Sequence, residues 1–304
     1  MSPRLDGKVA VITGTGDGQA RTAALRFAAE GATVVGCDIN EETASETLRL
    51  VREAGGKMDS FFPLDLIDEQ KTHDLMEYAA ETHGGIDILY NNAMRFALGT
   101  AEDLTLDDFN WSIAQTLTID WLTTKHAIPH FRKRGGGSII NIASVAGLSY
   151  GAGTSFPGNL GSCFAYNLAK AAVLRMTTTL AVDLAPIHVR VNAISPGPIN
   201  TPMAAPIYGS EQAPFYAPYM KQLLVDRVGR EDDIVNLALY LASDESSFMT
   251  GSNLICDGGI TASGGLGRPD AELDQVVNGQ FASMLNTDTG WTTVGERAPG
   301  RATA

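Results

Sequence analysis

The sequence predicts an α/β fold in a single domain, with a doubly wound parallel sheet of about seven strands and helices on both faces. Short apolar runs rich in β-branched residues alternate along the chain with longer segments of helical periodicity. Alternation of this kind produces parallel strands joined by right-handed crossovers. A glycine-rich turn also joins the first strand to the first helix, as it does in dinucleotide-binding domains.

The individual elements follow from the local pattern. Pro129 interrupts one long helical segment, and we expect a bend there because proline removes a helical hydrogen bond. Strands are expected at 8–13, 33–37, 59–64, 86–90, 137–143, 188–194 and 252–256. Helices are expected at 19–30, 41–54, 68–83, 105–134, 163–185 and 231–242.

The turn after the first strand is the first candidate for a binding site. The apolar run Val9–Ile12 is followed at once by Gly14 and Gly18, and a helical pattern then begins. Small residues let the backbone approach a pyrophosphate, and the helix N-terminus supplies free N–H groups. An ordinary tight turn is the alternative. It is disfavoured because the second strand ends at Asp38, 20 residues after Gly18, where a carboxylate can hold ribose hydroxyls. That carboxylate would repel a 2′-phosphate, so we predict NAD rather than NADP.

A tyrosine and a lysine four residues apart form the second candidate. The spacing of Tyr166 and Lys170 puts both side chains on one face of a helix. A phenol holds its proton until about pH 10, and a neighbouring ammonium lowers that pKa. A lowered pKa suits a general base near neutral pH. Such pairs are common on helix surfaces, so the pair needs support from the other motifs.

Composition limits the classes of partner. The chain has 304 residues, 44% of them apolar and 19% charged, which suffices for one large domain. A net charge of −13 and a pI of about 4.7 argue against nucleic acid and anionic membranes as main partners. There is no apolar run long enough to span a membrane, and Met1–Lys8 leads into the first strand without a signal peptide. With three scattered cysteines, these features predict a cytoplasmic protein.

The five histidines do not predict a metal site. His126 and His130 have i, i+4 spacing, but Pro129 interrupts their helix and no third ligand is apparent. We expect this pair to have structural or interface roles. The prediction is therefore no metal.

Several motifs occur in one order between about Leu5 and Ala262, and together they resemble the short-chain dehydrogenase/reductase family. Each motif alone is modest, whereas the ordered set is specific. The motifs are Thr13-Gly14-x-x-x-Gly18-x-Ala20, Leu64-Asp65-Leu66, Asn91-Asn92-Ala93, Ser144, the Tyr166/Lys170 pair, Asn192–Thr201 and Asp257-Gly258-Gly259.

The resemblance implies a Rossmann-like, NAD(H)-dependent oxidoreductase that interconverts a secondary alcohol and a ketone. It implies that Tyr166 is the general acid/base, that Lys170 lowers its pKa and holds the ribose, and that Ser144 binds the reacting oxygen. It also implies assembly as a homotetramer or homodimer. The cofactor-binding residues it implies are Gly14, Asp17, Gly18, Gln19, Asp38, Ile39, Asp65, Leu66, Asn92, Ala93, Tyr166, Lys170, Pro196, Gly197, Ile199 and Thr201.

The chain departs from the family pattern at several positions. Ala20 replaces the last glycine of the cofactor turn, and Met94 replaces the glycine of the Asn-Asn-Ala-Gly stretch. Thr116 falls where the family often has a catalytic asparagine; it can still hydrogen-bond a water, but it lacks the amide. The proton relay through Lys170 is then altered or uses another group. The segment 149–159, rich in glycine, serine and proline, makes the Ser144–Tyr166 interval longer than usual and predicts a loop near the substrate.

The resemblance also implies the domain boundaries and the roles of two segments outside the core pattern. Residues 1–262 form the catalytic domain, and 202–225 corresponds to its substrate lid. The aromatic and methionine side chains of that lid suit an apolar or cyclic, steroid- or terpenoid-like, small-molecule substrate, or else pack within the protein. Residues 263–304 form an extension with a helical stripe that we expect to pack on a neighbouring subunit. Two other functions stay open: an NAD-binding protein with little turnover, and a 3-oxoacyl or polyol reductase.

Overall fold

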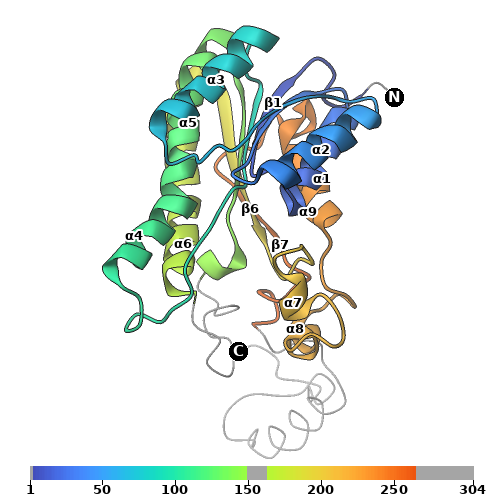
Figure 1. The fold of residues 1–304 in the computed structure, drawn as a ribbon, viewed down its shortest axis with the longest axis vertical. Helices are drawn as coiled ribbons and strands as arrows, with labels where there is room; N and C mark the ends of the chain where they lie inside the picture. The colour runs from blue at the N-terminus through green and yellow to red at the C-terminus, as the bar shows by residue number, and fades with distance from the viewer. Residues whose placement is uncertain (1–2, 149–162, 265–304) are drawn as a thin grey trace, which may run out of the picture.

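The fold is a single parallel sheet with helices on both faces, as predicted (Figure 1). The computed structural model describes residues 3–148 and 163–264. Seven strands pair in the order β3-β2-β1-β4-β5-β6-β7, and every pairing is parallel. The strands are β1 Val9–Thr13, β2 Thr33–Cys37, β3 Lys57–Phe61, β4 Ile88–Asn91, β5 Gly137–Ile142, β6 Val189–Pro196 and β7 Asn253–Cys256.

The helices form a layer on each face of the sheet. Figure 1 shows α1, α2 and α9 on one side and α3, α5 and α6 on the other. Their bounds, with those of the helices that flank the site, are α1 Gly18–Ala29, α2 Glu41–Glu53, α3 Glu69–His83, α4 Leu106–Ile113, α5 Ile119–Arg134, α6 Phe164–Asp183, α7 Ala205–Tyr208, α8 Tyr216–Gln222 and α9 Glu231–Ala242. Short 3₁₀ turns occur at Val145–Gly147, Ala185–Ile187 and Asp244–Ser246.

Strand β1 shows how the sheet separates two apolar cores. All five of its residues are buried. Ala10 and Ile12 belong to the core under α1 and α9, whereas Val9 and Val11 belong to the core under α3 and α5. Successive side chains of a strand point to opposite faces, so a strand buried on both faces is apolar throughout. This explains why the first strand reads as an unbroken apolar run.

Two elements differ from the sequence-based expectation. Strand β3 ends at Phe61 rather than continuing to residue 64. The expected range contained Pro63, which has no N–H to donate to a strand ladder. The expected helix 105–134 is divided by a π-helical turn at Ala114–Thr118, whereas α5 continues through Pro129. Pro129 is exposed, so water can satisfy the carbonyl that loses its helical donor.

The remaining predictions concern segments at the end of the sheet. The interruption at 202–225 is present and contains α7 and α8, which pack against each other. The expected loop 149–159 lies outside the described residues, as does the expected extension from residue 265 to the end.

Candidate functional site

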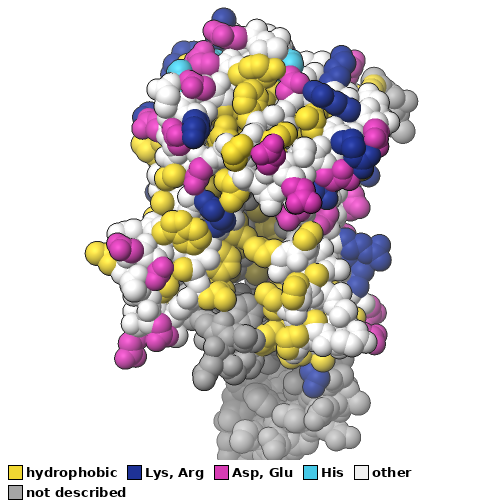
Figure 2. Space-filling model, in the orientation of Figure 1, with side chains coloured by type: hydrophobic (Ala, Val, Ile, Leu, Met, Phe, Trp, Pro, Cys, Tyr) yellow, Lys and Arg dark blue, Asp and Glu magenta, His cyan; other side chains and the backbone are white. Residues whose placement is uncertain are grey.

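A cavity of about 400 Å³ lies beyond the carboxyl ends of the strands. Figure 2 shows a hollow on this side of the molecule, bordered by hydrophobic side chains. Ligands of open α/β sheets bind at this edge, at the point where the strand order reverses, which here lies between β1 and β4. The structure brings all the expected cofactor-binding residues to the wall of this cavity: Gly14, Asp17, Gly18, Gln19, Asp38, Ile39, Asp65, Leu66, Asn92, Ala93, Tyr166, Lys170, Pro196, Gly197, Ile199 and Thr201.

The turn between β1 and α1 is shaped for close approach by a ligand. Gly14 and Gly18 have φ angles of 73° and 57°, a region that favours glycine. A Cβ on Gly14 would lie 3.0 Å from the Cα of Ala93. A Cβ on Gly16 would lie 2.5 Å from Thr43 Oγ1. Side chains at these positions would fill or distort the cradle, so the turn fits a pyrophosphate at the N-terminus of α1.

Asp38 occupies the end of β2 beside that turn. Its Oδ2 accepts a hydrogen bond of 2.8 Å from the Gly16 N–H, and its Oδ1 accepts one of 2.8 Å from the Asn40 N–H. Arg21, the cation closest in sequence to the turn, donates to the carbonyl oxygens of Gly16 and Thr43. The fixed carboxylate therefore faces the cavity, while the guanidinium is bound to protein oxygens.

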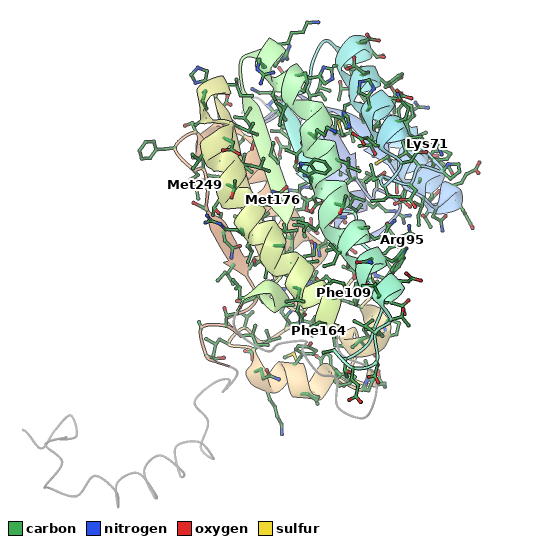
Figure 3. All side chains as sticks on the ribbon, turned by 90° about the vertical axis from the view of Figure 1, so that its left-hand side faces the viewer. Lys71, Arg95, Phe109, Phe164, Met176 and Met249 are labelled. Carbon is green, nitrogen blue, oxygen red and sulfur yellow. The ribbon has the colours of Figure 1, made fainter. Side chains whose placement is uncertain are left out.

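A hydrogen-bonded group of charged and polar side chains lines another part of the cavity wall. Arg95 donates to Asp65 Oδ2 at 3.1 Å, and the Gln115 amide donates to Asp65 Oδ1 at 3.2 Å. Arg95 also donates to Gln115 Oε1 at 3.0 Å. Its guanidinium lies 5.5 Å from the centroid of the Trp111 ring, and Figure 3 shows Arg95 near the end of α4. Both carboxylate oxygens of Asp65 are thus held by neighbouring side chains.

Ser144, Tyr166 and Lys170 meet at the opposite part of the cavity. Ser144 lies two positions after the last residue of β5, Ile142, and its hydroxyl accepts a hydrogen bond of 3.1 Å from the Ala146 N–H. The first two turns of α6 carry Tyr166 and Lys170 on one face. Lys170 is 2% exposed, and its Nζ donates to the carbonyl of Ile142 at 2.5 Å. Strand β5 therefore anchors both the serine and the lysine.

The pKa of Tyr166 differs from the sequence-based expectation. Burial raises the pKa of its phenol to about 12, and a hydrogen bond with Ser144 lowers it. Lys170 does not lower it in this structure, because its Nζ points to the carbonyl of Ile142 and lies 5.8 Å from the centroid of the Tyr166 ring. The expected effect of the ammonium on the phenol is therefore absent from this arrangement of the protein groups.

Thr116 does not line the cavity. Its side chain is fully buried in the π-helical turn, and its hydroxyl donates to the carbonyl of Arg95 at 3.0 Å. We expected this hydroxyl to be available to a relay water. The structure instead uses it to tie the turn to the loop after β4.

Aromatic side chains border the Tyr166 end of the cavity. Tyr208 and Met203 of the 202–225 segment line it, and the Tyr208 ring packs edge-on against Tyr219 at 5.0 Å between centroids. Phe96 packs against the Tyr166 ring at 4.5 Å between centroids and an interplanar angle of 31°. Phe215 of the same segment is buried, so part of the segment faces the cavity and part packs within the protein.

Several residues of the cavity wall were not predicted from the sequence. Gly16 lies inside the glycine turn that was identified, so its spacing was a usable signal. Arg95 and Gln115 gave no pattern in the sequence, because they meet Asp65 across 30 and 50 positions of the chain. Other lining residues that were not predicted include Asn40 and Thr43, whereas Met203 and Tyr208 belong to the predicted substrate lid.

Residues 3–148 and 163–264 contain no group of three or more His, Cys, Asp or Glu side chains that could hold a metal ion. His126 and His130 face the carboxylates of Glu69 and Glu77 instead, each at 3.2 Å. No helix in these ranges has the length and apolar character needed to cross a membrane.

Known proteins resemble this chain over most of its length. A family model described as Enoyl-(Acyl carrier protein) reductase matches residues 14–261. Trans-4-hydroxycyclohexanecarboxylate dehydrogenase of Sinomonas cyclohexanicum is 38% identical over 276 residues, covering 89% of this chain and 99% of that protein. The 3-oxoacyl-(acyl-carrier-protein) reductase FabG of Thermotoga maritima is 35% identical over 262 residues, covering 84% and 99%.

A solved structure agrees with these sequence matches. A 7α-hydroxysteroid dehydrogenase complexed with NADH and 7-oxo glycochenodeoxycholic acid superposes with a TM-score of 0.75 at 31% identity. The match covers 85% of this chain and 96% of that one.

Proposed function

This chain belongs to the short-chain dehydrogenase/reductase family, an oxidoreductase family that uses a nicotinamide cofactor, and from its site we propose an NAD(H)-dependent secondary-alcohol dehydrogenase. The observation that carries the proposal is the meeting of Ser144, Tyr166 and Lys170 in one cavity whose other end holds Asp38. A cavity with catalytic polar groups at one end and a dinucleotide cradle at the other supports hydride transfer.

Asp38 supports the preference for NAD. Two backbone N–H groups fix its carboxylate at the cavity wall, where it can accept hydrogen bonds from ribose hydroxyls. A phosphate at the same place would meet a fixed negative charge. Among the described residues that line the cavity, the cationic side chains are Arg95 and Lys170, and both are bonded to protein oxygens.

The residues of the chain position and protonate the reacting group. When bound, the nicotinamide cofactor accepts or donates the hydride. Tyr166 takes the hydroxyl proton during oxidation and returns it during reduction. Ser144 hydrogen-bonds the reacting oxygen and holds it within reach of the phenol. Lys170, on the same helix face as Tyr166, would supply the cation that stabilises the phenolate and would hold the ribose of the cofactor.

The cavity wall favours an apolar or cyclic substrate. Tyr208 and Met203 supply an aromatic and apolar border to the cavity, and Phe96 packs against the Tyr166 ring. Two matched proteins act on ring compounds by name, a hydroxycyclohexanecarboxylate and a steroid. We therefore expect a cyclic secondary alcohol, with the aromatic side chains packing against its ring.

Two other functions have specific support. The Thermotoga relative is a 3-oxoacyl reductase, which favours an acyl-chain substrate. The buried, engaged hydroxyl of Thr116 favours a cofactor-binding protein with little turnover. The intact set of Ser144, Tyr166 and Lys170 counts against the second function, since a protein without turnover has no use for all three.

The test is a panel of cyclic alcohols and 3-hydroxyacyl esters offered with NAD and, separately, with NADP. Formation of reduced cofactor is followed by absorbance. We expect turnover with NAD on cyclic alcohols. Turnover with NADP on acyl esters would favour the 3-oxoacyl reductase. Tight binding of NADH without turnover of any compound would favour the protein with little turnover.

A further inference from the structure

Arg95 is a cationic side chain of the cavity wall that the proton transfer at Tyr166 does not use. It lies four positions after Asn91, the last residue of β4, and it lines the cavity together with Asp65 and Gln115. The side chains of Arg95 and Asp65 are 38% and 40% exposed, and ion pairs at that exposure contribute little to folding. A pair that stabilises the fold so little, yet lines a ligand cavity, is a candidate for a role in binding.

Three protein donors occupy the carboxylate of Asp65. The Ile67 N–H and the Gln115 amide donate to Oδ1, each at 3.2 Å, and Arg95 Nη2 donates to Oδ2 at 3.1 Å. The same amide lies 3.5 Å from Oδ2, which is too long for a strong bond. A carboxylate has about four lone-pair sites, so among the described residues one acceptor site, on Oδ2, is left for a ligand.

Arg95 and Gln115 fix each other as well as Asp65. The Gln115 side-chain oxygen accepts from Arg95 Nη2 at 3.0 Å and from Nε at 3.3 Å, which sets the orientation of the amide. The Arg95 N–H donates to the Gln115 carbonyl at 3.1 Å, and the Thr116 hydroxyl donates to the Arg95 carbonyl at 3.0 Å. The guanidinium also lies 5.5 Å from the centroid of the Trp111 ring. The loop after β4 and the π-helical turn therefore hold the direction of the Asp65 carboxylate.

Asp65 lies beside the place where Asp38 would hold the ribose of a dinucleotide. The Leu64 N–H donates to the Asp38 carbonyl at 2.8 Å, so the segment after β3 is tied to the end of β2. Ile39 and Leu66 line the cavity next to these two acids and supply apolar surface for the faces of a planar ring. A ring whose edge meets the free acceptor of Asp65 must present a donor there. Adenine carries such a donor in its 6-amino group, whereas hypoxanthine has a carbonyl at the same position.

We propose that Arg95 is a positioning residue that, with Gln115, aims the remaining acceptor of Asp65 at the 6-amino group of adenine, so that the site selects adenine dinucleotides. The proposal rests on the NAD-dependent function proposed above. Asp65 contacts the base, and Arg95 acts through it. The arrangement also gives the Thr116 hydroxyl a use outside the proton relay, since that hydroxyl holds the backbone of Arg95.

Binding of two reduced dinucleotides tests the proposal without requiring turnover. The probes are NADH and its hypoxanthine analogue, in which a carbonyl replaces the 6-amino group, and fluorescence titration gives a Kd for each. We expect wild type to bind NADH at least about tenfold more tightly than the analogue, because that carbonyl offers Asp65 no donor. Arg95→Met should reduce this ratio at least about threefold, since the carboxylate is then free to turn. A ratio near one in wild type, or an unchanged ratio in Arg95→Met, would overturn the proposal.

Two further variants distinguish positioning from a purely structural role. In an Asp65→Ala background the ratio should already be near one, and adding Arg95→Met should not reduce it further. An equal reduction in both backgrounds would overturn the proposal. Arg95→Lys retains a cationic donor but not the planar fork, so its ratio should lie between those of wild type and Arg95→Met. If Arg95→Met does not fold, a wild-type ratio in Arg95→Lys would overturn the proposal.

Arg49→Met is the matched control for the loss of a surface cation. Arg49 is half-exposed on α2 and pairs with Glu46 and Glu53. It should keep the wild-type ratio, and a reduction equal to that of Arg95→Met would overturn the proposal. A protein that binds NADH but oxidises no alcohol would instead contradict the proposed dehydrogenase, while the binding ratios would still decide the role of Arg95.

Discussion

The carboxylate of Asp38 accepts a hydrogen bond of 2.8 Å from the backbone N–H of Gly16, so the end of β2 is tied to the glycine turn after β1. The two residues follow adjacent parallel strands, which pair from Val9 with Thr33 to Thr13 with Cys37. This bond fixes the acid at the mouth of the dinucleotide cradle before any ligand arrives. Cofactor choice therefore depends on a group that is already in place.

Replacing Asp38 should change the cofactor preference. Asp38→Asn removes the negative charge that opposes a 2′-phosphate and weakens the acceptor for the ribose hydroxyls. We expect the ratio of kcat/KM with NAD to kcat/KM with NADP to fall about a hundredfold, or about 3 kcal/mol. Steady-state kinetics with both cofactors measure it. Glu41→Gln, an exposed acid at the start of α2, is the control and should leave the ratio unchanged.

Adding a methyl group at Gly16 should weaken cofactor binding while preserving the fold. The new Cβ would lie 2.8 Å from Asp38 Oδ2 and 2.5 Å from Thr43 Oγ1, so both side chains must move. The φ angle of Gly16 is not in the left-handed region, so we expect little backbone strain. We predict a KM for NAD raised about tenfold, or about 1.4 kcal/mol, with Tm nearly unchanged. A variant with wild-type KM would show that the turn does not approach the cofactor.

Much of this site could be predicted from the sequence because its parts are local. The glycine turn, Asp38 and the Tyr166/Lys170 pair each follow from spacing within one element or across one turn. Asp65 was also predicted, but its two partners were not, because Arg95 and Gln115 lie 30 and 50 positions further along the chain, and Gln115 sits in the π-helical turn at Ala114–Thr118. No periodicity marks such a turn, since it adds a residue to a helix that is otherwise regular.

The direction of the Lys170 side chain could not be predicted from the sequence, for a different reason. Spacing placed the ammonium beside the phenol on one helix face, but it could not give the direction of the Lys170 side chain. A main-chain carbonyl of β5, 28 positions earlier in the chain, accepts its hydrogen bond. The burial that raises the pKa of Tyr166 is likewise a property of the packed site, not of the helix.

Oxidation should become faster as the pH rises. Tyr166 must lose its proton before it can accept one from the alcohol, and burial raises its pKa to about 12 in the protein alone. At pH values below the pKa of a required base, the fraction of active enzyme increases about tenfold per pH unit. We therefore expect kcat/KM for oxidation to rise from pH 6 to pH 9 by nearly tenfold per pH unit. The value of kcat/KM for ketone reduction should not rise over this range. A flat oxidation profile would exclude a phenol of raised pKa as the base.

Removing the ring of Phe96 should slow the chemistry without weakening cofactor binding. Phe96 lies against the Tyr166 ring at 4.5 Å between centroids, and such aromatic pairs contribute about 0.5–1.5 kcal/mol. We expect Phe96→Ala to lower kcat up to about tenfold while the KM for NAD stays unchanged.

Phe109→Ala is the matched control for Phe96→Ala. Its ring packs near Phe164 at 6.5 Å between centroids, and Figure 3 shows this pair where α4 approaches the start of α6. Phe109 packs near Phe164, whereas Phe96 packs against the Tyr166 ring, so this variant should keep kcat near the wild-type value. An equal loss in both variants would point to general destabilisation rather than to support of Tyr166.

Tyr166 transfers the proton in the proposed NAD-dependent oxidation, and a comparison of wild type with Tyr166→Phe tests this role. Turnover of a cyclic alcohol is followed by absorbance of the reduced cofactor, and NADH binding is followed by fluorescence titration. We predict a loss of kcat of at least about a thousandfold with a Kd for NADH within about threefold of wild type, because only the phenolic oxygen is removed. Turnover near the wild-type rate in Tyr166→Phe would contradict the account.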